Sequence, residues 1–202
     1  MRDFKYCTYR VFWAFAFKDR AAGIPVGSLF PSAAEKHTAI PKVVAALLRI
    51  REVDPRRFER IQRQVARIQL LGSRLVALGS WYNALSMIML AGDWVEAAST
   101  SPDRIALTIV HEATHARLMR FGYAEDIRAR IERICNYQEL VFASRIAGAS
   151  ELIASARRAM DTDPSGFTSE DHRQRSLKAL ATLGVPKWII RLLDRVTRSR
   201  AA

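Results

Sequence analysis

Three residues in the middle of the chain have the types and the spacing of a metal site. His111, Glu112 and His115 form the pattern H-E-x-x-H. In an α-helix, positions four residues apart lie on one face, so both imidazoles can reach a single metal ion. Glu112 lies beside them, where its carboxylate can act on a water bound to that ion. The sequence therefore predicts a Zn²⁺ site at His111 and His115, with Glu112 as the catalytic residue.

The segment that carries this pattern has the start and stop signals of a helix. Ser101 is a suitable N-cap, Pro102 fits the first helical position, and Asp103 complements the positive helix end. Gly122 is a natural residue just beyond the last turn. A second helix over about residues 124–147 follows at once, so we expect an antiparallel helical hairpin. The expected core stripe of the first helix consists of Ile105, Ile109, Ala113 and Ala116.

The hairpin indicates where a third ligand should lie. Catalytic zinc takes three protein ligands and keeps one position open. His111 lies eleven residues before Gly122, and Glu132 lies ten residues after it, so the two should stand at the same height. Glu139 would stand about 10 Å further along its helix, at a rise of about 1.5 Å per residue. We therefore expect Glu132 as the third ligand, with Glu139 as the alternative.

With these residues the chain resembles the zincin metallopeptidases. The glutamate ligand makes it most similar to the gluzincin branch, and the resemblance covers about residues 84–147. It implies a zinc-dependent hydrolase that cleaves peptide or protein substrates. In this family the residue matching Glu112 takes a proton from the zinc-activated water and passes it to the leaving amine. The resemblance also implies that residues 84–90 form a sheet edge that binds substrate as an added strand.

Other family features are matched only in part. Gluzincins carry an Asp four residues after the ligand Glu, which orients a zinc-bound histidine. Asn136 stands there in this chain and could accept the same hydrogen bond. The family's downstream acid–base histidine has no clear counterpart, since His172 is the only later histidine. The neighbouring candidates for stabilising an oxyanion are Tyr123, Arg128 and Tyr137.

The remaining segments predict a helix-rich α+β domain with a small sheet packed on the H-E-x-x-H helix. Pro41 opens one helix, and Asp54 as N-cap with Pro55 opens another. A turn is expected at residues 81–83. The expected strands are residues 68–71, 75–78 and 84–91, and the expected later helices are residues 151–160, 169–183 and 186–198.

The domain organisation expected from these patterns is an aromatic, loop-rich N-terminal segment, residues 1–40, followed by one zincin-like domain, residues 41–202. The apolar run at residues 11–17 favours an aromatic strand or a segment resting on a membrane surface over a cleaved signal peptide. No apolar run is long enough to predict a transmembrane helix. We expect a cytoplasmic location, with peripheral membrane association or export left open.

Composition allows a second function from another class. The chain has 202 residues, half of them hydrophobic, and a formal net charge of +12. Arginines at helical spacing are typical of solvated helix faces. They could also attract anionic surfaces, so the alternative is a basic protein that binds nucleic acid or anionic membranes and whose metal site is structural or vestigial. The two cysteines, Cys7 and Cys135, do not form a disulfide framework, and we expect Cys135 to be a small core residue.

Overall fold

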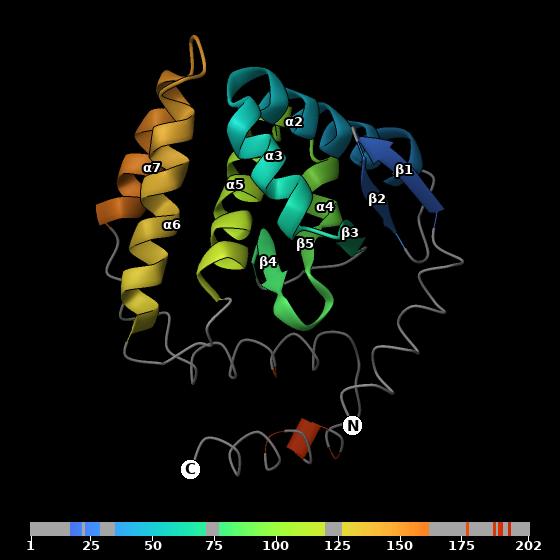
Figure 1. Ribbon diagram of the computed structural model, residues 1–202. Helices are drawn as coiled ribbons and strands as arrows, with labels where there is room; N and C mark the ends of the chain where they lie inside the picture. Colours follow the sequence, from blue (N-terminus) through green and yellow to red (C-terminus); the bar gives the residue numbers. More distant parts are fainter. Residues whose placement is uncertain are drawn as a thin grey trace.

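The computed structural model describes residues 17–21, 23–28, 35–71, 77–119 and 127–161, with isolated positions between 177 and 194. These residues confirm the α+β class, because helices pack against a small mixed sheet (Figure 1). In chain order the elements are β1 (Phe17–Ala21), β2 (Ile24–Ser28), η1 (Glu35–Ala39), α2 (Ile40–Val53), α3 (Pro55–Gln64), β3 (Arg67–Leu71), β4 (Gly79–Tyr82), η2 (Asn83–Leu85), β5 (Met87–Ala91), α4 (Gly92–Glu96), α5 (Pro102–Leu118), α6 (Arg128–Ala143) and α7 (Ser150–Asp161).

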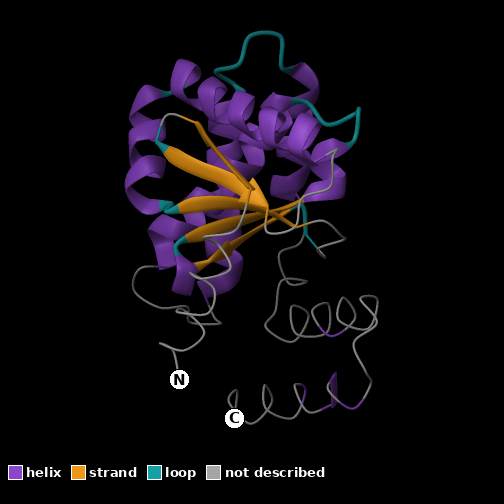
Figure 2. Cartoon of the chain, turned by 90° about the vertical axis from the view of Figure 1, so that its right-hand side faces the viewer, coloured by secondary structure: helices purple, strands orange, loops and turns teal. Residues whose placement is uncertain are grey.

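The strands form one sheet in the order β1-β2-β3-β5-β4, with the helices behind and above it in Figure 2. β3 pairs in parallel with β2 and with β5. β1 pairs antiparallel with β2, and β4 pairs antiparallel with β5. The prediction that residues 84–90 form an edge of the sheet is therefore wrong, because β5 lies between β3 and β4. β4 is the edge strand next to β5.

Two further sequence expectations change around this edge. The turn expected at residues 81–83 comes later, at residues 83–86, because Trp81 and Tyr82 still pair with β5. Of the strand expected at residues 75–78, residues 75 and 76 lie outside the described part, and residues 77 and 78 form a bend. β5 itself is buried along its whole length, as its unbroken apolar run predicts.

The N-terminal segment contributes to the same sheet. β2 pairs with β3 through Val26 and Ile68, and both side chains are fully buried in one hydrophobic cluster. Ile40, the last residue of that segment, already belongs to α2. β1 and β2 of this segment are thus part of the common sheet, whereas sequence reasoning expected an aromatic, loop-rich segment. Residues 11–16 lie outside the described part of the chain.

The helix start signals are confirmed. Ser101 caps α5 by accepting a hydrogen bond from the backbone N–H of Arg104, and Asp54 caps α3 in the same way. The expected core stripe of α5 is buried throughout and packs in the main cluster with α2 and the sheet, except that Ala116 is buried outside it. α6 ends at Ala143, earlier than expected, and a turn with Gly148 in the left-handed region leads into α7. Gly122 and most of the two last expected helices lie outside the described residues.

None of the helices in the described ranges combines the length and the apolar character needed to cross a membrane.

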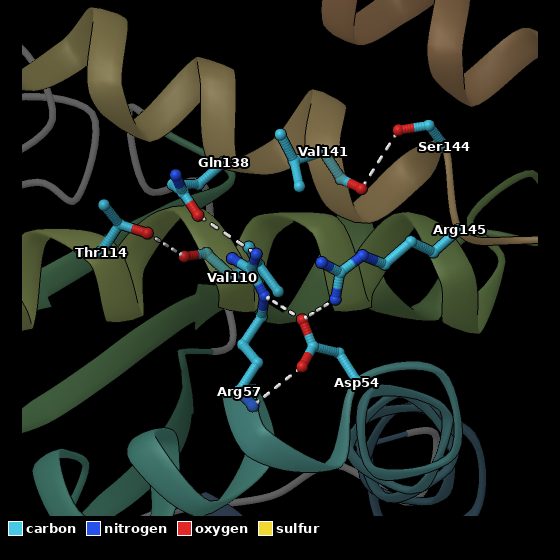
Figure 3. A network of polar contacts seen from close by, with 8 residues as sticks. All are labelled: Asp54, Arg57, Val110, Thr114, Gln138, Val141, Ser144 and Arg145. Carbon is cyan, nitrogen blue, oxygen red and sulfur yellow. Dashed lines mark hydrogen bonds and ion pairs between the residues drawn. The ribbon is translucent and has the colours of Figure 1, made fainter.

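A buried ionic network ties the α2–α3 junction to α6 (Figure 3). Asp54 accepts hydrogen bonds from the backbone N–H and the Nε of Arg57, each at 3.0 Å, and it also pairs with Arg145. Arg57 Nη2 donates to Gln138 on α6 at 3.1 Å. The same guanidinium lies 5.9 Å from the ring centre of Phe142. Burial would raise the pKa of Asp54, but the hydrogen bonds and charge of Arg57 outweigh it and lower that pKa.

We expect Asp54→Ala to reduce the free energy of unfolding by about 3 kcal/mol or more, because it leaves a buried arginine without its partner and removes a helix cap. The carboxylate's lowered pKa means that its contribution is complete at neutral pH and is lost as the pH falls. The difference between wild type and variant should therefore shrink below about pH 4. Urea unfolding at several pH values measures this.

Asp54→Asn keeps the hydrogen-bond acceptor of the cap and loses the charge. Its free energy of unfolding should therefore lie between those of wild type and Asp54→Ala. Glu59→Ala changes an exposed carboxylate on the same helix and should stay within about 0.5 kcal/mol of wild type. An equally small effect for Asp54→Ala would show that the network does not stabilise the fold.

Candidate metal centre

The facing sides of α5 and α6 bring the predicted site residues together. α5 presents His111 and His115, and α6 presents Glu132 and Glu139. The earlier histidine contacts both glutamates and the later histidine contacts only the earlier glutamate, as antiparallel helices require. All four side chains are largely buried, with at most 17% of any of them exposed. The expected hairpin geometry is therefore present, although the residues that connect the helices lie outside the described part.

Three of these side chains have the spacing of ligands around one ion. His111 Nε2 lies 3.1 Å from His115 Nε2 and 3.3 Å from Glu132 Oε2. His115 Nε2 lies 3.6 Å from Glu132 Oε1. Ligand atoms about 2.0–2.2 Å from a tetrahedral zinc ion are about 3.3–3.6 Å from one another. The distance between the two imidazoles is slightly shorter than this range, and the two Glu132 distances involve different carboxylate oxygens. The three side chains are thus close enough together, and of suitable donor chemistry, to be compatible with a metal ion.

Glu139 contacts the other nitrogen of His111. Its Oε1 lies 3.5 Å from His111 Nδ1, whereas Glu132 lies beside Nε2. A carboxylate at Nδ1 orients the ring and favours the tautomer whose Nε2 is free for a metal. The two glutamates, which sequence reasoning treated as alternatives, therefore suit two different roles.

The second histidine has no such support. Within the described residues, no group forms a hydrogen bond with the buried Nδ1 of His115. Asn136, which the family resemblance suggested for orienting a histidine, donates its Nδ2 to the carbonyl of Ala159 at 3.0 Å. Asn136 therefore links α6 to α7, and the polar contacts of the His115 ring are those that its Nε2 makes with His111 and Glu132.

Cys135 is a donor that sequence reasoning assigned only to the core. It is fully buried, as expected, and its sulfur also lies within 4.8 Å of ring nitrogens of His111 and His115. The structure thus contains a His-His-Cys group at metal-binding distance, next to the His-His-Glu group. Both sets share the two histidines. A sequence signal existed, because Cys135 follows Glu132 by three residues and so lies near it on the helix surface.

Glu112 lies against the edge strand. It is buried, and Gly79 at the start of β4 faces it. A Cβ at Gly79 would come within 3.1 Å of Glu112 Cγ and 3.2 Å of its Oε1, and within 2.7 Å of Thr108 Cγ2. The missing side chain at Gly79 therefore leaves the space that Glu112 occupies. Sequence reasoning did not single out Gly79, although a glycine inside a strand often marks such a close approach.

Burial and mutual proximity shift the pKa values of this group. Burial raises the pKa of Glu112, and the charges of His111 and His115 act in the opposite direction. Burial would lower the pKa of His111, but its hydrogen bonds to Glu132 and Glu139 outweigh this and raise it to about 10. Burial would raise the pKa of Glu132, but the two histidines outweigh this and lower it. The buried carboxylates therefore need positive charge beside them.

Two further candidates from the sequence, Tyr137 and Arg128, lie in the described part of α6. Tyr137 is half-exposed on α6. Arg128 begins that helix and is partly buried. Tyr123 and His172 lie outside the described residues.

No family model, curated protein or solved structure matches this chain. The function is therefore inferred from the geometry and chemistry of the centre itself.

We expect Gly79→Ala to destabilise the protein by about 1–3 kcal/mol, the usual cost of adding a methyl group to a packed interior. The added Cβ would push against Thr108 and Glu112. Denaturant unfolding measures this change, and the metal content of the same samples reports whether the histidines have moved.

Thr108→Ser offers a matched test of the cause. It removes the methyl group nearest to the added Cβ and keeps the hydroxyl that donates to Arg104. The double variant Gly79→Ala/Thr108→Ser should recover part of the lost stability. Simple addition of the two single effects would rule out this contact as the source.

Proposed function

We propose that this protein is a zinc-dependent metallopeptidase-like hydrolase. His111, His115 and Glu132 hold the ion, and Glu112 is the general base. The observation that carries the proposal is the convergence of three side chains: the two Nε2 atoms lie 3.1 Å apart, and they lie 3.3 Å and 3.6 Å from Oε2 and Oε1 of Glu132, respectively. Two histidines and a glutamate leave one position open on tetrahedral zinc, as catalytic sites require.

The chemistry divides between the ion and the side chains. Zinc, when bound, would polarise a carbonyl and lower the pKa of a water molecule, so that this water can lose a proton and act as a nucleophile at neutral pH. Glu112 accepts the proton of that water and donates it to the leaving amine. Burial raises the pKa of Glu112, which favours its holding the proton between the two steps. Glu139 holds His111 through Nδ1 and is a positioning residue.

The edge strand supports a peptide as the substrate class. β4 has no partner on its outer side among the described strands, and its first residue lies against Glu112. An extended peptide can pair with such an edge through backbone hydrogen bonds, which do not depend on its side chains. β4 thus replaces residues 84–90 in the role that the family resemblance suggested.

We expect the purified protein to bind about one equivalent of zinc, and His111→Ala or His115→Ala to bind less than about half an equivalent. Glu139→Gln should weaken binding by about 10–100-fold, the usual effect of removing a group that orients a ligand. Glu132→Ala should weaken it more. Because the pKa of His111 is about 10 in the metal-free protein, zinc displaces a proton at neutral pH. The affinity should therefore rise about tenfold per pH unit between about pH 6 and 8.

Cys135→Ser is the control that separates the two donor sets. With Glu132 as the third ligand, this variant should bind zinc within about threefold of the wild-type affinity, since none of the metal ligands is removed. The Co²⁺-substituted protein should then lack a thiolate-to-metal absorption band. A strong band that disappears in Cys135→Ser would assign the third position to the thiol and overturn the ligand set.

We expect Glu112→Gln to retain zinc and to lose at least about 100-fold in turnover, because the amide cannot accept a proton. A mixed peptide library, with products detected by mass spectrometry, measures cleavage without assuming a sequence preference. Chelation should abolish the wild-type cleavage, and zinc should restore it.

Tyr137→Phe is a suitable control for this substitution, since the half-exposed hydroxyl lies on the same hairpin and should not be required. Full cleavage by Glu112→Gln would exclude the proposed general base. Zinc binding by wild type without any chelator-sensitive cleavage would instead favour a structural metal site.

A further inference from the structure

A second site lies between α3, α5 and α6. A pocket there is lined by three arginines, namely Arg57 and Arg60 of α3 and Arg117 of α5. Thr114 and Gln138 add polar atoms to its wall. None of the described residues that line this arginine pocket is acidic.

The arginine pocket is separate from the metal centre. α5 contributes Val110, Ala113, Thr114 and Arg117 to it. With about 3.6 residues per turn, these positions lie on a different side of α5 from His111 and His115. The two sites therefore share a helix and use different faces of it.

The charges around the pocket do not balance. Asp54 is the acid beside its wall, and its carboxylate is shared by Arg57 and Arg145 (Figure 3). Arg60 and Arg117 are exposed and add two further positive charges. Three arginines thus line the pocket, and the aspartate that pairs with one of them is also shared with Arg145. Burial lowers the pKa of Arg57, Asp54 opposes this, and the charges of Arg60 and Arg145 lower it further.

The side chains at the wall are also held in place. Arg57 is buried and is fixed by Asp54 and by Gln138 Oε1. The Thr114 hydroxyl donates to the Val110 carbonyl at 2.8 Å. A fixed guanidinium at the base with two exposed ones at the rim suits an anion with several oxygens, because each planar guanidinium can donate two parallel hydrogen bonds.

We propose that the arginine pocket binds a phosphate-type anion, either free phosphate or a phosphate monoester. Arg60 and Arg117 contact the anion from the rim, and Arg57 faces it from the base. Binding is independent of the metal and of the proposed hydrolase activity.

The test is calorimetric titration of the chelated full-length protein with inorganic phosphate, at an ionic strength held constant with chloride. The pocket variant is Arg60→Gln/Arg117→Gln, whose sites are exposed, so the fold is retained. The control variant is Arg130→Gln/Arg133→Gln, which removes two exposed arginines of α6 that do not line the pocket. Both variants change the net charge equally.

The pocket variant should bind phosphate at least about tenfold more weakly, the effect of losing one hydrogen bond between charged groups. The control variant should stay within about twofold of wild type, because screened surface charges contribute little. Equal weakening in both variants would mean general charge attraction and would overturn the proposal, as would absence of binding by wild type.

Two further arms locate the anion and its source. His111→Ala should bind phosphate as tightly as wild type, and a loss there would place the anion at the metal centre and overturn the proposal. Glycerol phosphate in place of inorganic phosphate distinguishes the sources. Tighter binding of the ester identifies a phosphate monoester as the ligand, and weaker binding identifies free phosphate.

Discussion

The constraint on which the centre depends is the burial of three carboxylates and two imidazoles between α5, α6 and β4. Uncompensated, Glu112, Glu132 and Glu139 would place three negative charges where little water can reach them, which is strongly unfavourable. In the metal-free protein the compensation comes from protons, as the raised pKa values of His111 and Glu112 indicate. A divalent cation between the histidines and Glu132 would supply the same charge at the point where the donor atoms converge. The need for charge balance thus explains why the proposed metal and the protonated metal-free state are alternatives for one site.

The fold meets this constraint by holding two helix faces and one strand at fixed separations. The hydrophobic cluster on the other side of α5 anchors that helix against α2 and the sheet. Arg57 bridges Asp54 and Gln138, and so joins the α2–α3 junction to α6. α6 is also linked to α7 through Asn136. The distances between the imidazoles and the glutamates therefore depend on contacts well away from the centre.

The edge strand β4 determines the position of Glu112. Gly79 brings the backbone of β4 close to Glu112, and a larger residue there would occupy the space of the carboxylate. The same closeness places the outermost of the described strands on this side of the sheet beside the proposed general base. One glycine thus connects the position of the catalytic group with the surface that would present an extended substrate.

The sequence by itself determined the local features. H-E-x-x-H at helical spacing, the caps at Ser101 and Asp54, and the unbroken apolar run of β5 are each properties of a short stretch, so they could be predicted from it. The height of Glu132 also followed, because two helices joined by a short connection must run antiparallel. Family membership, substrate and metal identity remain predictions, since they are not properties of local structure.

Only the tertiary structure decided which groups meet. It separated Glu132 from Glu139 by the ring nitrogen that each contacts, and it brought Cys135 close to both histidines. It joined the N-terminal strands to the sheet and moved the edge from residues 84–90 to β4. Strand order and side-chain contacts between helices depend on pairings between residues distant in sequence. No local pattern encodes these pairings, because they are selected by the packing of the whole core.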